Sequence, residues 1–403
     1  MTALCIAVVV TTTAFEAYAR THSLTGPYWV FMAPDATVQY GLLCLGIFHA
    51  WVAKAVREAM AIGTASAIFA LLILLGDFEF VRSDKQLFSY AVALGSAVVQ
   101  IGVLAVLIHN GAPLDDRLRL ARESVTFAMA VALPTTFVYL TMDINPTQDH
   151  LVAQFDDGLG IRIISLIKWV VSLSPIFREF LNWVYGGTPL AIAVIFAMQR
   201  PELPPVPLTV FISTVAGLAL YTVIPVVGPP ATYPEYYASL WQDAGANSLT
   251  PPTARTDLPR NCMPSLHTAW AVLFVFGSHG LPRLYRALSS AAAALTIVSA
   301  IEIGAHWFLD LVVALPFAVA VQGFASFEQR SSGPERMMAI LGGSAIMLAL
   351  LALMYLQPLR FQYSAVLHWA AVVAAVVASV YLWRRLADRA LGGAQPRTAS
   401  SAG

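Results

Sequence analysis

Apolar runs of membrane-helix length recur along almost the whole chain, and they constrain its fold more than any other feature. A hydrocarbon core of ~30 Å needs about 20 apolar residues per helical crossing, and only helices and closed barrels satisfy their backbone hydrogen bonds there. The runs lie at 2–19, 37–54, 60–80, 87–109, 123–142, 180–198, 206–227, 264–281, 285–304, 306–328, 337–356 and 364–384. We therefore predict an all-α polytopic membrane protein with about 10–12 transmembrane helices.

The composition agrees with a lipid environment. Of the 403 residues, 58% are hydrophobic and only 11% are charged, whereas a soluble domain carries about 25% charged residues. The net charge is zero and the basic residues form no stripe, so nothing indicates a nucleic-acid partner. Cys5, Cys44 and Cys262 are too few and too scattered for a disulfide framework or a metal cluster. We expect membrane lipids as partners, and the composition does not indicate an oligomeric state.

Charged residues between the runs predict the orientation. Under twelve alternating spans, most basic connectors fall on one side of the membrane and most acidic residues on the other. The basic side holds Lys54, Arg57, Arg117, Arg119, Arg122, Arg200, Arg283, Arg286, Arg330, Arg336, Arg384, Arg385 and Arg389. Because basic loops stay in the cytoplasm, we place both termini there and the protein in a cell inner membrane. Residues 4–18 lack a basic start and contain Glu16, so we interpret them as a retained helix rather than a signal peptide.

The string Pro264-Ser265-Leu266-His267 stands where an apolar run begins. Proline at a first helical position marks a helix start. There the free backbone N–H groups of residues 265–267, the Ser265 hydroxyl and the positive end of the helix dipole favour a phosphate. Taken alone, the string fits a serine cap beside an interfacial histidine, without any substrate, at least as well.

His306 and Asp310 form a second string, His306-Trp307-Phe308-Leu309-Asp310. A spacing of four residues puts both side chains on one helix face. The carboxylate then accepts from one imidazole nitrogen and leaves the other free as base or nucleophile. Because an aspartate is costly against lipid, we expect Asp310 to face the bundle interior. The alternative is a structural histidine–aspartate hydrogen bond between helices.

The spacing between the two strings brings them to one membrane face. His267 and His306 are 39 residues apart, or ~58 Å of helix at ~1.5 Å per residue, which is about two crossings. Together they supply what phosphoryl transfer needs: His306 as nucleophile oriented by Asp310, His267 as acid and base, and Ser265 with the helix N-terminus for the phosphoryl oxygens. Under the orientation above, this face is periplasmic or exoplasmic. A two-histidine, one-carboxylate metal site is an alternative. The other histidines form no cluster, so we expect no metal and no cofactor.

These residues resemble a known family. The two strings are similar to the second and third motifs of the type-2 phosphatidic acid phosphatase superfamily. A further string resembles its inositol phosphorylceramide synthase branch: Tyr221-x-x-x-Pro225-x-x-Gly228-Pro229-Pro230. The resemblance covers roughly residues 180–330. It implies a six-helix core, an outward-facing site, a phosphohistidine formed on His306, and the roles given above for His267, Ser265 and Asp310.

The chain departs from the family pattern at its phosphate-binding cations. The first motif, Lys-x6-Arg-Pro, is absent, because Arg200-Pro201 has Ala193 in place of the lysine. The arginine expected six residues before the third-motif histidine is Ala300. These losses fit the synthase-like branch better than the phosphatases and leave the phosphate charge to another residue. Our first candidate is Arg260, and the others are Lys168, Arg178 and Arg255. Each of them also fits an ordinary surface position near lipid head groups.

On this basis we divide the chain into transmembrane helices at 1–142, a phosphatase-like catalytic core at 160–330, transmembrane helices at 331–388 and a disordered tail at 389–403. Residues 162–180 mix charged and bulky apolar side chains and are predicted to form an interfacial helix. We expect a lipid phosphotransferase whose substrate-binding residues are Ser265, Leu266 and Arg260. The alternatives are a phosphatase acting on lipid phosphates or prenyl diphosphates, and a non-catalytic transporter or scaffold.

Overall fold

The computed structural model describes residues 146–186, 203–229, 260–328, 333–360 and 364–392, together with a few single positions. The chain divides into two compact units, Met1–Tyr139 and Leu140–Gly403, and nearly all described residues belong to the second. The predicted spans at 2–19, 37–54, 60–80, 87–109 and 123–142 lie outside the described residues, apart from single positions in the last. Most of the predicted tail at 389–403 lies outside them as well.

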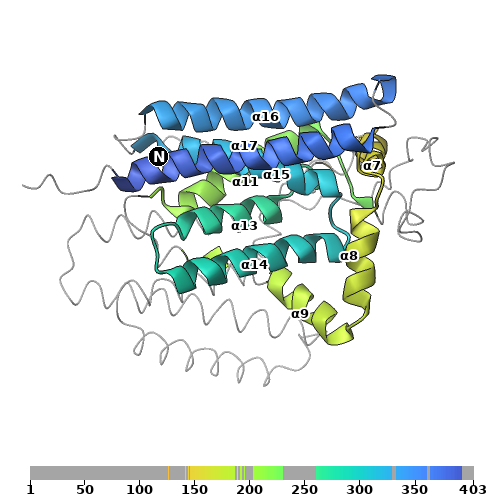
Figure 1. Ribbon diagram of the computed structural model, residues 1–403, viewed down its shortest axis with the longest axis horizontal. Coiled ribbons are helices and arrows are strands. Elements are labelled where there is room, and N and C mark those ends of the chain that lie inside the picture. The colour runs from red at the N-terminus through yellow and green to blue at the C-terminus, as the bar shows by residue number, and fades with distance from the viewer. Residues whose placement is uncertain are drawn as a thin grey trace, which may run out of the picture. The chain divides into compact units, whose positions relative to one another are not determined.

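The described part is built from helices without strands (Figure 1). Their bounds are α7 Asp149–Gly158, α8 Ile163–Ser172, α9 Pro175–Gly186, α11 Val206–Val223, α13 Leu266–Gly277, α14 Arg283–Glu302, α15 Phe308–Ala325, a short 3-10 turn η4 Ser326–Glu328, α16 Gly333–Arg360 and α17 Ala365–Gly392. Five of them, α11, α14, α15, α16 and α17, are long and apolar enough to cross a membrane. The prediction of an all-α polytopic membrane protein is confirmed.

Helix α15 is the central element of the bundle. Within its apolar span, 83% of the residues are buried inside the molecule, whereas the other four spans reach 22–50%. It packs against α11, α13, α16 and α17, and Figure 1 shows α16 and α17 on one side of it and α13 and α14 on the other. Helices α11 and α14 end, and α13 and α15 begin, where α7 lies. We call this the α7 end of the bundle.

The predicted interfacial helix at 162–180 is divided into two helices, α8 and α9. The break falls at Leu173 and Ser174, directly before Pro175, because proline disfavours a helical residue before it and suits the first position of a new helix. Helix α8 runs across the direction of the bundle helices (Figure 1). Trp169 and Ile176 expose 53% and 84% of their surface, so this α8–α9 elbow presents apolar side chains outward.

Small residues allow α15 and α16 to pack closely. A Cβ atom on Gly343 of α16 would lie 2.6 Å from the Pro316 carbonyl oxygen and 2.9 Å from the Ala320 nitrogen. A Cβ atom on Gly323 of α15 would lie 3.1 Å from the backbone of Arg336 and Ile340. Close backbone approach at small residues is the usual basis of helix association in membranes. The position of α15 therefore depends on these glycines.

Gly343→Ala is expected to lower the free energy of unfolding by about 1–3 kcal/mol, because the added methyl group meets rigid backbone and forces the two helices apart. Thermal unfolding in detergent, followed by circular dichroism, measures the effect. The matched control is Gly342→Ala, whose Cβ would meet only the end of the flexible Leu382 side chain and which gains up to about 1 kcal/mol of helix propensity. An equal loss of stability in both variants would contradict this account of the packing.

Candidate active site

Three connecting segments meet at the α7 end, after α11, before α13 and before α15. The Cys262 N–H donates to the Val226 carbonyl over 3.1 Å, and the Cys262 thiol donates to the Ala305 carbonyl over 2.8 Å. Gly228 has a φ of +109°, and a Cβ there would lie 3.0 Å from the Ala305 oxygen. Only glycine suits both this backbone conformation and this close approach. The segments that carry the predicted motifs are thus in direct contact.

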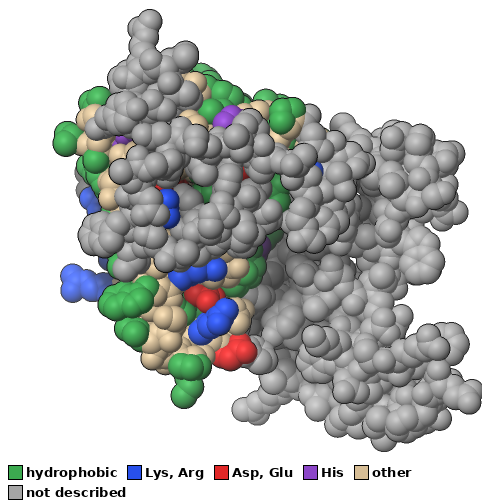
Figure 2. Space-filling view, turned by 90° about the vertical axis from the view of Figure 1, so that its right-hand side faces the viewer, with side chains coloured by type: hydrophobic (Ala, Val, Ile, Leu, Met, Phe, Trp, Pro, Cys, Tyr) green, Lys and Arg blue, Asp and Glu red, His purple; other side chains and the backbone are tan. Residues whose placement is uncertain are grey.

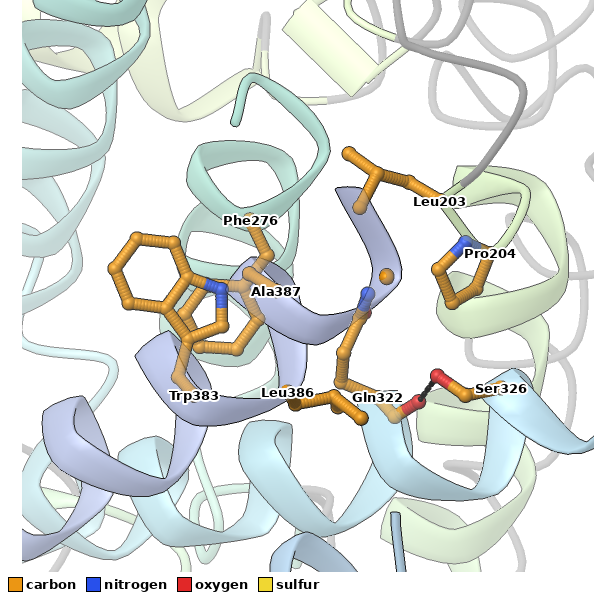
Figure 3. Close-up of a pocket in the computed structure, with 9 residues that line it drawn as sticks. Leu203, Pro204, Phe276, Gln322, Ser326, Trp383, Leu386 and Ala387 are labelled. Atoms are coloured by element: carbon orange, nitrogen blue, oxygen red, sulfur yellow. Dashed lines mark hydrogen bonds between the residues drawn. The ribbon is translucent and has the colours of Figure 1, made fainter. Parts of the chain in front are cut away.

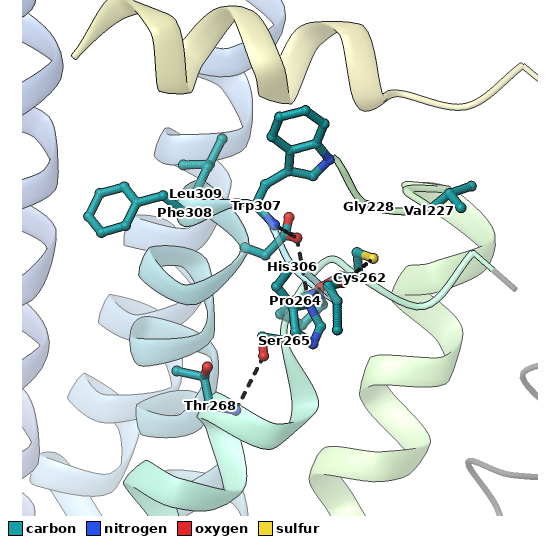
Figure 4. A network of polar contacts seen from close by, with 12 residues as sticks. Val227, Gly228, Cys262, Pro264, Ser265, Thr268, His306, Trp307, Phe308 and Leu309 are labelled. Atoms are coloured by element: carbon teal, nitrogen blue, oxygen red, sulfur yellow. Dashed lines mark hydrogen bonds and ion pairs between the residues drawn. The ribbon is translucent and has the colours of Figure 1, made fainter. Parts of the chain in front are cut away.

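His306 is held by its Nδ1 atom. This nitrogen lies 3.0 Å from the carbonyl oxygen of Cys262 and 3.6 Å from Asp310 Oδ2 (Figure 4). A carbonyl oxygen only accepts hydrogen bonds, so Nδ1 carries the proton and the lone pair is on Nε2. The sequence predicted Asp310 as the partner that fixes the tautomer. The Cys262 backbone takes that position, and the carboxylate lies just beyond hydrogen-bond distance.

Asp310 instead caps the start of its own helix. Its Oδ2 atom accepts from the Trp307 N–H over 2.8 Å, while its buried Oδ1 atom has no hydrogen-bond partner. The carboxyl group faces the bundle interior, as its full burial shows. Asp310 therefore places negative charge next to the His306 imidazole, while only one of its two oxygens accepts a hydrogen bond.

Ser265 caps α13, and its backbone N–H is already used. The Ser265 Oγ atom accepts from the Thr268 N–H over 3.3 Å, and the Ser265 N–H donates to the Asp310 carbonyl over 3.3 Å. The expectation that this N–H points outward as a phosphate donor is wrong, because α15 supplies its acceptor. The Tyr221 hydroxyl, from the string that ends α11, donates to the Pro264 carbonyl over 3.1 Å. These bonds tie the start of α13 to α11 and α15.

His267 lies on the first turn of α13, at the same end of the bundle as His306. Its ring stacks on the ring of Tyr185 from α9, with centroids 3.9 Å apart and an angle of 21°. The Trp270 ring lies 5.5 Å away, and its indole N–H donates to Ser213 Oγ over 3.0 Å. Burial, together with the charge of His306, lowers the pKa of His267 to about 3. The contact with Tyr185 was not predicted, since nothing in the sequence links α9 to α13.

Two buried carboxylates of α7, Asp149 and Asp156, hold the segment that follows His306. Asp149 accepts from the Trp307 indole N–H over 2.9 Å and from the Gly228 N–H over 2.9 Å. Asp156 accepts from the N–H groups of Phe308 and Leu309 over 2.8 and 3.1 Å. Burial raises the pKa of both carboxyl groups, and these donors oppose the rise. A helix start leaves its first backbone N–H groups without partners inside the helix. The sequence therefore indicated that acceptors were needed at the start of α15, but not which residues supply them.

The basic residues that are candidates for binding the phosphate lie in different parts of the structure. Arg260 is fully buried, and its Nε atom donates to the Ile144 carbonyl over 3.2 Å. Arg178 of α9 pairs with Glu302 at the end of α14, with Nε and Oε1 2.9 Å apart. Lys168 of α8 lies within electrostatic range of both partners. Arg255 lies outside the described residues.

The thiol of Cys262, the imidazole of His306 and the carboxylate of Asp310 offer ligand atoms that all lie within 4.8 Å of one another. The group is thus close enough to hold a metal ion. However, the Cys262 thiol and Asp310 Oδ2 are engaged with the backbone, and His306 Nδ1 faces a carbonyl. Burial raises the pKa of the Cys262 thiol well above its usual value, which disfavours the thiolate that a metal requires. Hydrogen bonding accounts for the cluster without an ion.

A small cavity lies at the opposite end of the bundle (Figure 3). Its lining includes Leu203, Phe276, Gln322, Ser326 and Trp383. Its volume of about 10 Å³ is comparable to the space of a single water molecule. A lipid head group does not fit there.

Residues 150–324 match the model of the PAP2 superfamily. No curated protein and no solved structure matches the chain. The matched range runs from α7 almost to the end of α15 and contains His267, His306 and Asp310. It does not distinguish the inositol phosphorylceramide synthase branch from the others. The match supports the predicted superfamily, and the matched residues include the segments that form the candidate site.

Proposed function

We propose that the chain is a membrane-embedded lipid phosphotransferase that moves a phosphoryl-linked head group between lipid or alcohol partners. The superfamily match supports an activity of the phosphatase or phosphotransferase type. The observation that carries the proposal is the contact of His306 Nδ1 with the Cys262 carbonyl at 3.0 Å. This contact leaves an unprotonated Nε2 atom, which is the form of histidine that attacks phosphorus.

The reaction proceeds in two displacements. His306 Nε2 attacks the phosphorus of the donor, and the phosphorus–oxygen bond to the leaving alcohol breaks. His267, whose protonated form the bound anionic phosphate stabilises against its lowered pKa, gives its proton to the departing oxygen. The hydroxyl of the acceptor then attacks the phosphohistidine, the nitrogen–phosphorus bond breaks, and His267 takes the proton of that hydroxyl. The imidazole becomes positively charged when Nε2 bonds phosphorus, and Asp310, 3.6 Å from Nδ1, stabilises this charge.

The phosphoryl oxygens need donors at the start of α13. The Ser265 hydroxyl retains its own proton while its oxygen accepts from Thr268, so it remains a donor in this proposal. The Leu266 backbone and Arg260 are the further binding groups that we assign. The catalytic core at 160–330 would contain all of them, with the helices at 1–142 and 331–388 as additions.

The proposed outward orientation is supported by the spanning helices α14, α16 and α17, in which most basic residues lie at the end opposite the site. Helices α14 and α16 begin, and α17 ends, at that opposite end. The residues are Arg283, Arg286, Arg336, Arg384, Arg385 and Arg389. By the positive-inside rule this end is cytoplasmic. The proposed site then faces the periplasm or exoplasm of a cell inner membrane.

His306→Asn is expected to reduce turnover at least about a thousandfold, because asparagine keeps an N–H donor for the Cys262 carbonyl and removes the nucleophilic nitrogen. Purified protein is incubated with ³²P-labelled phosphatidic acid and assayed for turnover and for an acid-labile label on the protein. His279→Asn, at the opposite end of the bundle, is the control and should keep both signals. Wild-type turnover in His306→Asn would refute the mechanism.

Transfer and hydrolysis share the phosphohistidine and differ in the group that resolves it. With a long-chain alcohol present, we expect the phosphoryl-linked group of the donor phospholipid to appear on the alcohol. Thin-layer chromatography of labelled products measures this transfer. Release of free phosphate alone, with or without the alcohol, would refute the phosphotransferase and leave a lipid-phosphate or prenyl-diphosphate phosphatase.

Removal of metal ions is expected to leave the activity unchanged, because each proposed step uses only imidazole, carboxylate and hydroxyl groups. The protein is dialysed against EDTA, assayed for turnover, and assayed again after Zn²⁺ is added. Loss of activity in EDTA with recovery in Zn²⁺ would show that Cys262, His306 and Asp310 hold a metal and would overturn the hydrogen-bonded account of the cluster.

A further inference from the structure

Helix α9 contacts α13, which carries His267, and the end of α14, which precedes His306. Its last turn carries Tyr185, which stacks on His267, and its first turn carries Arg178, which pairs with Glu302. The two α9 residues are seven positions apart, so they share one helix face and are ~10 Å apart along the helix. Glu302 ends α14 only four residues before His306. The ion pair therefore lies next to the segment that carries His306.

The Arg178–Glu302 ion pair combines a buried carboxylate with an arginine that a ligand can reach. The Glu302 side chain is only 6% exposed, whereas that of Arg178 is 66% exposed. Lys168 on α8 lies within electrostatic range of both groups, so two cations surround one buried carboxylate. Figure 2 shows basic and acidic side chains side by side among apolar ones on this face. Because Arg178 is mostly exposed and only its Nε atom contacts Glu302, its guanidinium remains accessible to an additional anion.

Apolar side chains on the same elbow indicate what kind of anion approaches. Trp169 follows Lys168 directly, and Leu173 and Ile176 precede Arg178, with exposures of 53%, 68% and 84%. Exposed apolar residues next to cations match a lipid, whose chains contact the apolar group while its phosphate contacts the cations. A small soluble anion gains nothing from those apolar side chains.

We propose that Arg178 and Lys168 bind the phosphate of an anionic phospholipid head group beside the candidate site, with Glu302 holding Arg178 when no lipid is bound. This inference rests on the proposed function, because it supplies the phosphate charge that the missing motif cations leave uncompensated. An arginine binds phosphate with two parallel hydrogen bonds, so the lipid displaces the single carboxylate contact.

Binding is measured separately from turnover, in the His306→Asn protein, by calorimetric titration with dioctanoyl phosphatidic acid in detergent micelles. Arg178→Gln and Lys168→Gln are each expected to weaken binding about tenfold. Arg178→Lys should recover part of the loss, because lysine keeps the charge but not the double hydrogen bond. Arg283→Gln, an exposed arginine at the opposite end, is the control and should bind as the parent does. Unchanged binding in Arg178→Gln would overturn the proposal.

Substitution of Glu302 tests the proposal by whether lipid binding becomes stronger or weaker. Glu302→Gln is expected to strengthen phosphatidic acid binding several-fold, because Arg178 loses the carboxylate that competes with the lipid. The matched control is Glu179→Gln, which removes an exposed carboxylate next to Arg178 that pairs instead with Asn182, and it should have little effect. Weaker binding in Glu302→Gln, as in Arg178→Gln, would show a purely structural ion pair and would overturn the proposal.

Inorganic phosphate distinguishes the source of the anion. We expect it to compete with phosphatidic acid only weakly, since it has no chains for the elbow, and phosphatidylcholine micelles to bind less tightly than phosphatidic acid. Equal affinity for free phosphate and for the lipid would overturn the choice of a lipid ligand. Arg178-dependent lipid binding without any turnover by the wild-type protein would refute the proposed function and leave the binding site in place.

Discussion

The backbone N–H groups at the start of α15 need acceptors inside the protein, and the geometry of the site depends on how that need is met. The span of this helix is 83% buried, so water does not satisfy these groups. Asp310 accepts from Trp307, and Asp156 accepts from Phe308 and Leu309. Both carboxylates also face the positive end of the helix dipole. The requirement therefore fixes α7 across the end of the bundle, where the motif segments meet.

The need for acceptors at the start of α15 also determines the orientation of the His306 side chain. Asp149 lies two turns before Asp156 on α7 and binds the Trp307 indole together with the backbone of Gly228. His306 immediately precedes Trp307, and its Nδ1 atom faces the Cys262 carbonyl. The Cys262 carbonyl thus holds the His306 ring, and Asp149 holds the residue that follows it, without a substrate. In the proposed mechanism this lowers the cost of reaching an in-line geometry at phosphorus.

The sequence predicted those features of the fold that the lipid environment imposes. Apolar runs at 206–227, 285–304, 306–328, 337–356 and 364–384 correspond to the five spanning helices of the described part, because crossing length and backbone satisfaction leave few alternatives. The common end of the two motifs follows from the length between them. The break at Pro175 had a readable local signal, which the prediction of one helix at 162–180 did not use.

The hydrogen bonds within the site were not predictable in the same way. Asp149 and Trp307 are 158 positions apart in the chain, and no local pattern connects them. The backbone N–H of Ser265 was assigned to a phosphate because a helix start normally exposes it, whereas the carbonyl of Asp310 accepts from it. Partners that come from another helix depend on packing. The sequence could therefore name the reactive side chains and could not name the groups that orient them.

Charge balance at the α7 end explains why the α8–α9 elbow matters for the proposed reaction. Asp149, Asp156 and Asp310 are all buried at this end, so a phosphate entering it meets negative charge that the helix N-termini only partly offset. Of the basic side chains that the structure describes there, Arg162 pairs with Asp157 and Arg260 donates to a backbone carbonyl. Arg178 is two-thirds exposed and shares Glu302 with Lys168. In the proposed binding mode, a phosphate that approaches from the lipid meets these two cations before it reaches the buried carboxylates, and their positive charge attracts it toward the site.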